Sequence, residues 1–192
     1  MRALMRAVAV VVAAVLVIGV GVAYSVASRG LGTRVAPHPL EALAARAMRY
    51  AATPSAERRL PNPVAATPEV LEEGLAHFAD HCASCHANDG SGATPLGQAL
   101  YPKAPDMRGD ATQGLSDGEL FSIIENGIRL TGMPAWSTGT PEGERASWAL
   151  VHFIRRLPAL SAADVVRMEA LNPKSEAEFR EQEEARRFLA GQ

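Results

Sequence analysis

The sequence predicts an all-α protein. Apolar residues recur at helical spacing behind capping residues, as after the pairs Thr67-Pro68 and Thr140-Pro141. No segment shows the sustained apolar–polar alternation of a half-buried strand. Stretches rich in glycine and proline separate the helical segments, so we expect short helices joined by long loops.

The charge of the chain is nearly balanced but unevenly placed. Residues 1–65 carry a net charge of +6 and the rest of the chain carries −8. With 47% hydrophobic residues, the chain has enough apolar side chains for a folded core. An acidic body without a basic stripe argues against nucleic-acid binding, so we expect protein partners.

A long apolar segment lies near the N-terminus. Arg2 and Arg6 precede an uncharged run of 21 residues from Ala7 to Ala27. As a helix this run would rise about 31 Å, which matches a hydrocarbon core of about 30 Å. We expect a single-pass anchor in the cytoplasmic membrane, with the rest of the chain on the periplasmic or other extracytoplasmic side. A cleaved signal peptide is the alternative, because Ser25-Val26-Ala27 offers small residues to a peptidase.

Four segments are expected along the chain. They are the anchor or signal peptide at 1–28, a Pro-rich linker at 29–66, a folded domain at 67–158 and a helical extension at 159–192. The linker carries five prolines and few large apolar residues, too few for a core of its own. We expect one short helix in it, from Leu40 to Tyr50.

Three helices with clear start signals are predicted within residues 67–158. The signals are Thr67-Pro68, the capping box Ser116-Asp117-Gly118-Glu119 and Thr140-Pro141. Gly127 is expected to end the second helix and Pro158 the third. Residues 87–114 should form irregular loop. In the extension, Ser161 and Ser175 are expected to cap two more helices.

The two cysteines of the chain lie together in the run Cys82-Ala83-Ser84-Cys85-His86. Cys-x-x-Cys-His is the attachment signature of c-type haem. Three residues apart on a helical turn, Cys82 and Cys85 point to one side, where each thiol can add to a vinyl group. His86 follows at once and can bind the iron. We therefore expect one covalent haem c.

Three other interpretations of the cysteine pair carry less weight. A thioredoxin-like redox motif needs a βαβ context, which the sequence does not predict. A structural zinc site usually takes a second pair of ligands, and the chain holds no further cysteine. A simple disulfide would leave the adjacent His86 unexplained.

A histidine-bound haem iron has a second axial position, and methionine is a common ligand there. Met133 lies in Gly132-Met133-Pro134, in a loop between two predicted helices. We expect His86 and Met133 to be the two metal ligands. Met107 and Met168 are expected to pack in the core.

On these residues, 67–158 resembles the class I c-type cytochromes. The match comprises Gly74 and Phe78 in the first helix, the Cys-x-x-Cys-His run, Pro105, the Met133 loop and the helix of Trp148. The resemblance implies a cytochrome c-like fold of three to four core helices around one haem. It also implies that Gly74 and Phe78 meet Trp148 or Val151. The resemblance further implies that a proline carbonyl accepts a hydrogen bond from the proximal imidazole; Pro105 is the best match, and Pro95 and Pro102 are the alternatives.

The haem propionates would need hydrogen-bond donors. Trp136, Tyr101, Arg108 and Arg129 are candidates by residue type and loop position. The resemblance ends near Pro158, so it assigns no role to the extension.

The sequence therefore predicts an electron carrier rather than an enzyme, although one that could belong to a redox complex. It would be a membrane-anchored mono-haem cytochrome that transfers single electrons outside the cytoplasm. Its expected partners are respiratory or dehydrogenase complexes of the same membrane. Two alternatives stay open: an enzymatic or sensory haem with an open iron position, and a structural subunit that acts mainly through residues 161–192.

Overall fold

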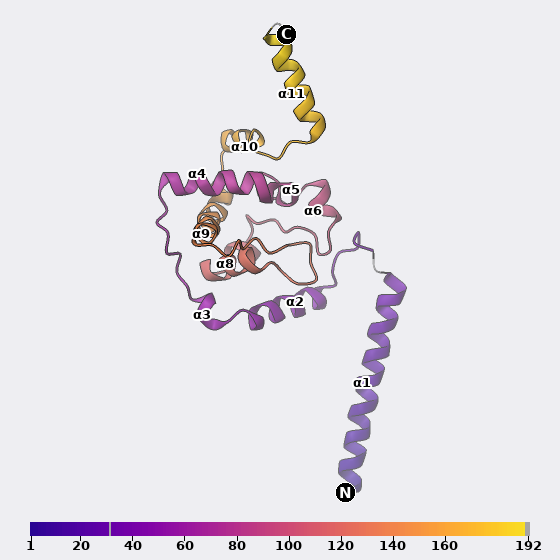
Figure 1. Cartoon of the computed structure of the whole chain (residues 1–192). Coiled ribbons are helices and arrows are strands. Elements are labelled where there is room, and N and C mark those ends of the chain that lie inside the picture. The colour runs from indigo at the N-terminus through magenta and orange to yellow at the C-terminus, as the bar shows by residue number, and fades with distance from the viewer. Residues whose placement is uncertain (31, 191–192) are drawn as a thin grey trace. The chain divides into compact units, whose positions relative to one another are not determined.

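The computed structural model describes residues 1–30 and 32–190. Every regular element in these residues is helical, which confirms the predicted fold class (Figure 1). The chain divides into two compact units, Met1–Val35 and Ala36–Gln192.

The first unit consists mainly of helix α1 (Arg2–Arg29). Its apolar part, Arg2–Ser28, has a mean hydropathy of 2.7 and no buried surface within the unit. By length and composition this helix could cross a membrane, although a signal sequence would have the same properties.

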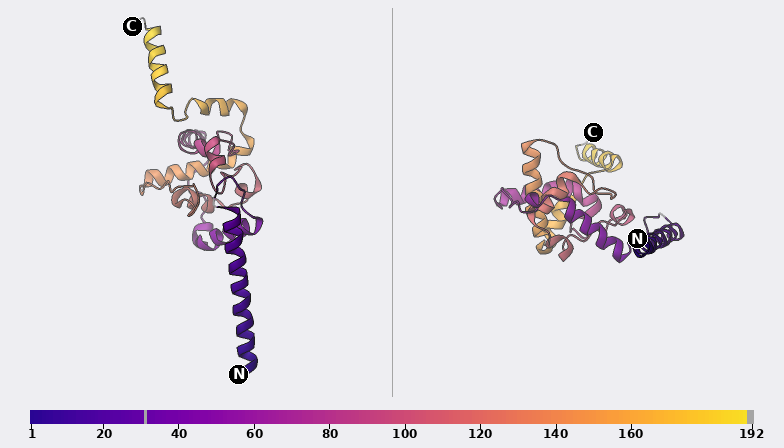
Figure 2. Two further views of the ribbon diagram at one scale, coloured as in Figure 1. Left: turned by 90° about the vertical axis from the view of Figure 1, so that its right-hand side faces the viewer. Right: turned by 90° about the horizontal axis from the view of Figure 1, so that it is seen from below.

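The second unit is built from short helices. In order they are α2 (Pro39–Ala52), α3 (Ser55–Arg58), α4 (Pro68–His77), the wide π-type turn η1 (Phe78–Cys82), α5 (Ala83–His86), α6 (Pro95–Ala99), α7 (Asp110–Gln113), α8 (Asp117–Asn126), α9 (Pro141–Arg156), the 3₁₀ turn η2 (Leu157–Ala159), α10 (Ala162–Glu169) and α11 (Glu176–Leu189). Figure 1 and Figure 2 place α4 and α10 on one side of α8 and α9, and α2 and α3 on the other.

The predicted helix starts are confirmed by side-chain caps. The hydroxyl of Thr67 accepts a hydrogen bond from the amide of Val70, and Thr140 caps α9 in the same way. Ser116, Ser161 and Ser175 each form a complete capping box with the acidic residue three positions later. These bonds satisfy amides that lack a partner within the helix, which fixes where each helix begins.

Helices α4 and α9 cross closely at Gly74. A Cβ there would overlap the carbonyl oxygen of Ala149 and lie 2.9 Å from the Cβ of Phe153. The rings of Phe78 and Phe153 pack beside this contact, with centroids 5.1 Å apart. Both aromatic side chains are fully buried, so the crossing forms the centre of the core.

The nearest neighbours of Gly74 therefore differ from the predicted Trp148 and Val151. Trp148 points toward α8 instead and stacks on Phe121, with ring centroids 4.0 Å apart. Helical spacing puts position 149 on the face that meets α4, which leaves Trp148 on the neighbouring face.

The structure also differs from the sequence prediction over residues 53–64, which were expected to be linker. The Asn62 amide donates to the carbonyl of Trp148 at 2.9 Å, and the Val64 carbonyl bonds to His152 at 2.7 Å. A Cβ at Gly118 would overlap the carbonyl oxygen of Glu57, so α3 lies directly against α8. Backbone and polar contacts thus hold this segment on the helical body even though it has few large apolar side chains.

Residues 87–114 and the extension also contribute to the fold. The expected loop at 87–114 contains α6, capped by the Thr94 hydroxyl, and α7. Helix α10 of the extension packs on the core through Met168, which is fully buried. The core role expected for Met168, and for Met107, is confirmed.

Candidate functional site

The cysteine pair lies where α4 ends. The wide turn η1 finishes at Cys82, and the single turn α5 carries Cys85 and His86. Both cysteines are free thiols, partly buried, so no disulfide joins them. Burial, and to a lesser extent the neighbouring Cys85, raises the pKa of Cys82 to about 12, so its thiol is neutral at pH 7.

The imidazole of His86 is directed into the protein. Burial lowers its pKa, an effect partly offset by the carbonyl of Pro105 nearby. The Nδ1 atom is buried and makes no hydrogen bond of regular geometry with any residue that the structure describes. Histidine binds a metal as the neutral imidazole, and a carbonyl close to the ring can fix its orientation.

The loop of Met133 is held by the end of α8. The Met133 carbonyl accepts from the amide of Ile128 at 3.1 Å, and the Trp136 amide donates to the carbonyl of Ile124 at 3.0 Å. Gly127 has a positive φ of 64° and packs on the Met133-Pro134 backbone, where a Cβ would lie within 2.7 Å of it. Met133 itself is half-buried.

This loop lies beside the cysteine turn. The ring of Trp136 meets the ring of His81 edge-on, with centroids 5.2 Å apart, and His81 directly precedes Cys82. On the other flank Gly132 packs against the side chain of Leu100, just after α6. The contact of Trp136 with His81, 55 positions apart in sequence, thus brings the Cys82–His86 run and the methionine loop together.

Comparison with protein families supports the same assignment. A family described as "Cytochrome C oxidase, cbb3-type, subunit III" matches residues 69–154, which include the cysteine motif and the Met133 loop. Residues 69–154 are a c-type cytochrome domain. Comparison of the chain with curated proteins finds no match.

The cytochrome assignment confirms the predicted resemblance. Domains of this family bind haem c and transfer electrons, so the cofactor and the general activity follow. The residues present fit that group: two free thiols three positions apart, a buried imidazole whose Nδ1 has no hydrogen-bond partner among the described residues, and a methionine loop beside them. The individual roles of the residues stay predictions.

In the cytochrome domain, the loop of Pro105 is tied to the chain that follows His86. The Met107 amide donates to the carbonyl of Gly90 at 2.8 Å. The Arg108 guanidinium pairs with Asp106 at 2.8 Å and with Asp89 at 2.9 Å. These bonds hold the loop at the position where the Pro105 carbonyl lies near His86.

This Arg108 network has a predictable pH dependence. Hydrogen bonds from Arg108 lower the pKa of Asp106 to about 2, against an ordinary value of about 3.9. Because the folded pKa is lowered, the network contributes to stability above about pH 4 and loses its contribution as the pH falls toward about 2. NMR titration of the Asp106 carboxyl should give a midpoint near 2. Arg108→Gln should raise that midpoint toward the ordinary value of about 3.9, but only part of the way, because the backbone amide of residue 108 still donates to the carboxylate. A midpoint that does not move in the variant would contradict the assignment.

The four residues expected to bind the haem propionates have different surroundings. Arg108 is paired with Asp89 and Asp106, and the hydroxyl of Tyr101 donates to Glu41 at 2.5 Å. Trp136 lies against His81, whereas Arg129 is exposed after the end of α8.

Sequence reasoning missed Arg49, on the inner side of α2. Its Nη1 atom is buried and has no hydrogen-bond partner in the described part of the chain. The helix reaches the site through Glu41, which accepts from Tyr101, the neighbour of Leu100 at the methionine loop. A buried guanidinium nitrogen without a partner is a donor available for a carboxylate of the cofactor. The sequence predicts the helix that carries Arg49, but its composition does not show which side of that helix packs on the rest of the unit.

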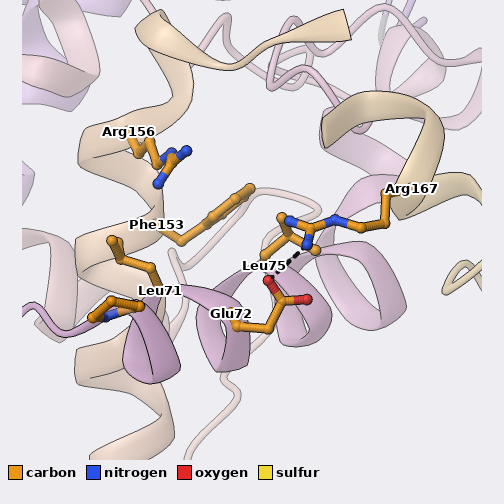
Figure 3. Close-up of a pocket in the computed structure, with 7 residues that line it drawn as sticks. Leu71, Glu72, Leu75, Phe153, Arg156 and Arg167 are labelled. Atoms are coloured by element: carbon orange, nitrogen blue, oxygen red, sulfur yellow. Dashed lines mark ion pairs between the residues drawn. The ribbon is translucent and has the colours of Figure 1, made fainter. Parts of the chain in front are cut away.

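A separate cavity of about 240 Å³ lies between α4, α9 and α10 (Figure 3). Leu71, Leu75 and Phe153 form its apolar wall, and the ion pair between Glu72 and Arg167, at 3.0 Å, lies at its edge. None of the cytochrome site residues lines it.

Proposed function

We propose that the chain is a membrane-anchored mono-haem c-type cytochrome that transfers single electrons between redox partners on the extracytoplasmic side of the membrane. The observation that carries this proposal is the placement of the Met133 loop beside the Cys82–His86 turn, through the contact of Trp136 with His81. In this role the protein carries electrons and is not an enzyme.

The proposed residue roles follow from their chemistry. Cys82 and Cys85 would form thioethers with the haem, and His86 and Met133 would supply the two axial ligands. Haem iron with both axial positions filled undergoes one-electron exchange and leaves no position for an added ligand. The Pro105 carbonyl would orient the His86 ring and increase its donor strength. We also propose that Arg49 pairs with a haem propionate.

The proposed location and partners rest on α1 and on the family. Helix α1 is long and apolar enough to anchor the chain, and Arg2 and Arg6 would keep its N-terminus in the cytoplasm. The matching family is described as a subunit of a cbb3-type cytochrome oxidase. We therefore propose that the partners are membrane respiratory or dehydrogenase complexes, an oxidase among them.

Substitution of the proposed sixth ligand tests this function directly. Met133→Leu in the haem-loaded protein should abolish the weak near-infrared charge-transfer band of methionine-ligated ferric haem. The reduction potential should fall, because methionine ligation favours ferrous iron. The matched control is Met168→Leu, which alters a buried core methionine and should retain the band.

The same experiment separates the alternatives. A ferric wild-type protein without the band, which binds carbon monoxide rapidly when reduced, would support an open iron and contradict the carrier. A pyridine haemochrome spectrum showing no covalent haem would contradict the proposal altogether. A stable partner lost on deletion of residues 161–192, with electron transfer unaffected by Met133→Leu, would favour the structural subunit.

A further inference from the structure

Helix α2 has two faces of different character. On the inner side Ala42 and Arg49 are partly buried, and Glu41 accepts the hydrogen bond from Tyr101 at 2.5 Å. At its end the Arg58 side chain donates to the carbonyl of Thr53 at 2.6 Å. The burial of Ala42 and Arg49 shows which side of α2 faces the rest of its unit. The Arg58 guanidinium lies over the ring of Tyr50, 3.9 Å from its centroid, at the end of the other side.

The opposite side of α2 is apolar and exposed. Its residues, called here the outer face, recur at helical spacing; they are Leu40, Leu43, Ala47, Met48, Tyr50 and Ala51. Leu40 is 68% exposed and Met48 is 67% exposed. A helix at the surface of a soluble protein normally turns its polar side outward. In α2 the charged residues Glu41, Arg46 and Arg49 all lie outside this row. An exposed apolar face of this kind indicates an interaction surface.

Charge around α2 identifies the kind of surface that would cover it. Residues 29–59 contain six arginines and two glutamates, a net charge of +4. The chain beyond residue 65 has a net charge of −8. Arg49 faces inward, and without it the segment still has five arginines and a net charge of +3. An apolar helix face within a basic segment matches an anionic lipid surface, which attracts basic residues and accepts apolar side chains between its headgroups.

The length of chain before α2 points to the same partner. Nine residues separate the end of α1 at Arg29 from the start of α2 at Pro39. Fully extended they span at most about 30 Å. With α1 in the bilayer, α2 can therefore never be far from the membrane surface.

We propose that the outer face of α2 lies in the interface of an anionic membrane, with its apolar side chains at the level of the headgroups and upper acyl chains. The proposal rests on α1 as a retained anchor, which belongs to the proposed function. Its consequence is that the cytochrome domain is held in one orientation on the bilayer, with the α2 side toward the lipid and the α10 side toward the aqueous phase.

Photo-crosslinking to lipid tests the proposal. The photoreactive residue p-benzoylphenylalanine is placed in turn at Leu43 and Met48, and at Val166 of α10 as a control that is 64% exposed. The full chain is reconstituted in vesicles of phosphatidylethanolamine and phosphatidylglycerol, and adducts are identified by mass spectrometry. We expect a several-fold higher yield of phospholipid adducts at positions 43 and 48 than at 166. Leu40→Asp combined with Ala47→Asp should lower the yield at 48 to that of the control.

Equal lipid yields at all three positions, or crosslinks to a second copy of the chain in place of lipid, would overturn the proposal. In native membranes, crosslinks from both α2 positions to another polypeptide instead of lipid would overturn it as well. The readout does not depend on haem. A haem stain and the intact mass, which show whether haem is attached and α1 is retained, test the proposed function separately.

Discussion

Gly97→Val is expected to disrupt the haem-attachment turn. A Cβ at Gly97 would overlap the carbonyl oxygen of Cys85 and lie 2.9 Å from the carbonyl oxygen of Gly92. Both obstacles are backbone atoms, so no side-chain rotation can relieve the overlap. Helix α6 would have to move away from Cys85, the residue that precedes His86, the proposed axial ligand.

The expected cost is about 3 kcal/mol in the free energy of unfolding, at the upper end of the usual range for overpacking. Covalent haem per chain should fall as well, because the turn that presents the second thiol is displaced. Denaturant unfolding and the pyridine haemochrome assay measure the two effects.

Ala99→Val is the matched control, because it adds a valine to the same helix at an exposed position. Its stability should change by less than about 0.7 kcal/mol, the scale of helix propensity. If Gly97→Val proved as mild as Ala99→Val, α6 would not be in tight contact with the motif.

Helix starts were predictable because their cause is local. The hydroxyl of Ser116 and the carboxylate of Glu119 bond to backbone only three residues away, so the tetrapeptide carries the whole signal. Thr94-Pro95 carries the same helix-start signal as Thr67-Pro68, but the glycines and prolines around it are more typical of a loop. The start of α6 can therefore be predicted from the sequence.

The packing of residues 53–64, in contrast, could not be predicted from the sequence. The bond from Asn62 to the carbonyl of Trp148 joins residues 86 positions apart, and its acceptor is a backbone atom that exists in every residue. Composition shows that a segment lacks apolar side chains, but it cannot show where its few polar groups will find partners. The contact of Glu41 with Tyr101 could not be predicted either, because composition does not show which partner a polar group will find.

The candidate site likewise contains some residues that the sequence predicts and some contacts that it does not. Cys82, Cys85 and His86 are adjacent in sequence, and their chemistry follows from spacing alone. The pairing of Arg108 with Asp89 is different, because the two lie 19 residues apart and meet only through the fold of the intervening loop. Arg108 was considered as a propionate donor, whereas its observed partners are carboxylates of the protein.

Arg49→Leu is expected to weaken the haem-loaded protein. The Nη1 atom of Arg49 is buried without a hydrogen-bond partner in the described residues, and an unsatisfied buried polar group usually costs about 1–3 kcal/mol. The cost disappears if a haem propionate accepts from this atom. Removing the guanidinium would then leave a buried carboxylate unpaired, a loss of about 3–5 kcal/mol.

Stability and reduction potential, measured together, distinguish an Arg49 side chain that pairs with a haem propionate from one that only packs. A positive charge near the haem favours the ferrous state, so its removal should lower the potential as well as the stability. Arg46→Leu, an exposed position on the same helix, should change neither. An Arg49→Leu protein that unfolds more easily at an unchanged potential would show that the side chain only packs. An Arg49→Leu protein that is more stable than the wild type would show that the guanidinium stays unpaired after haem is attached. In that case the wild type buries a charged group that has lost its water and gained no partner, and leucine removes this cost.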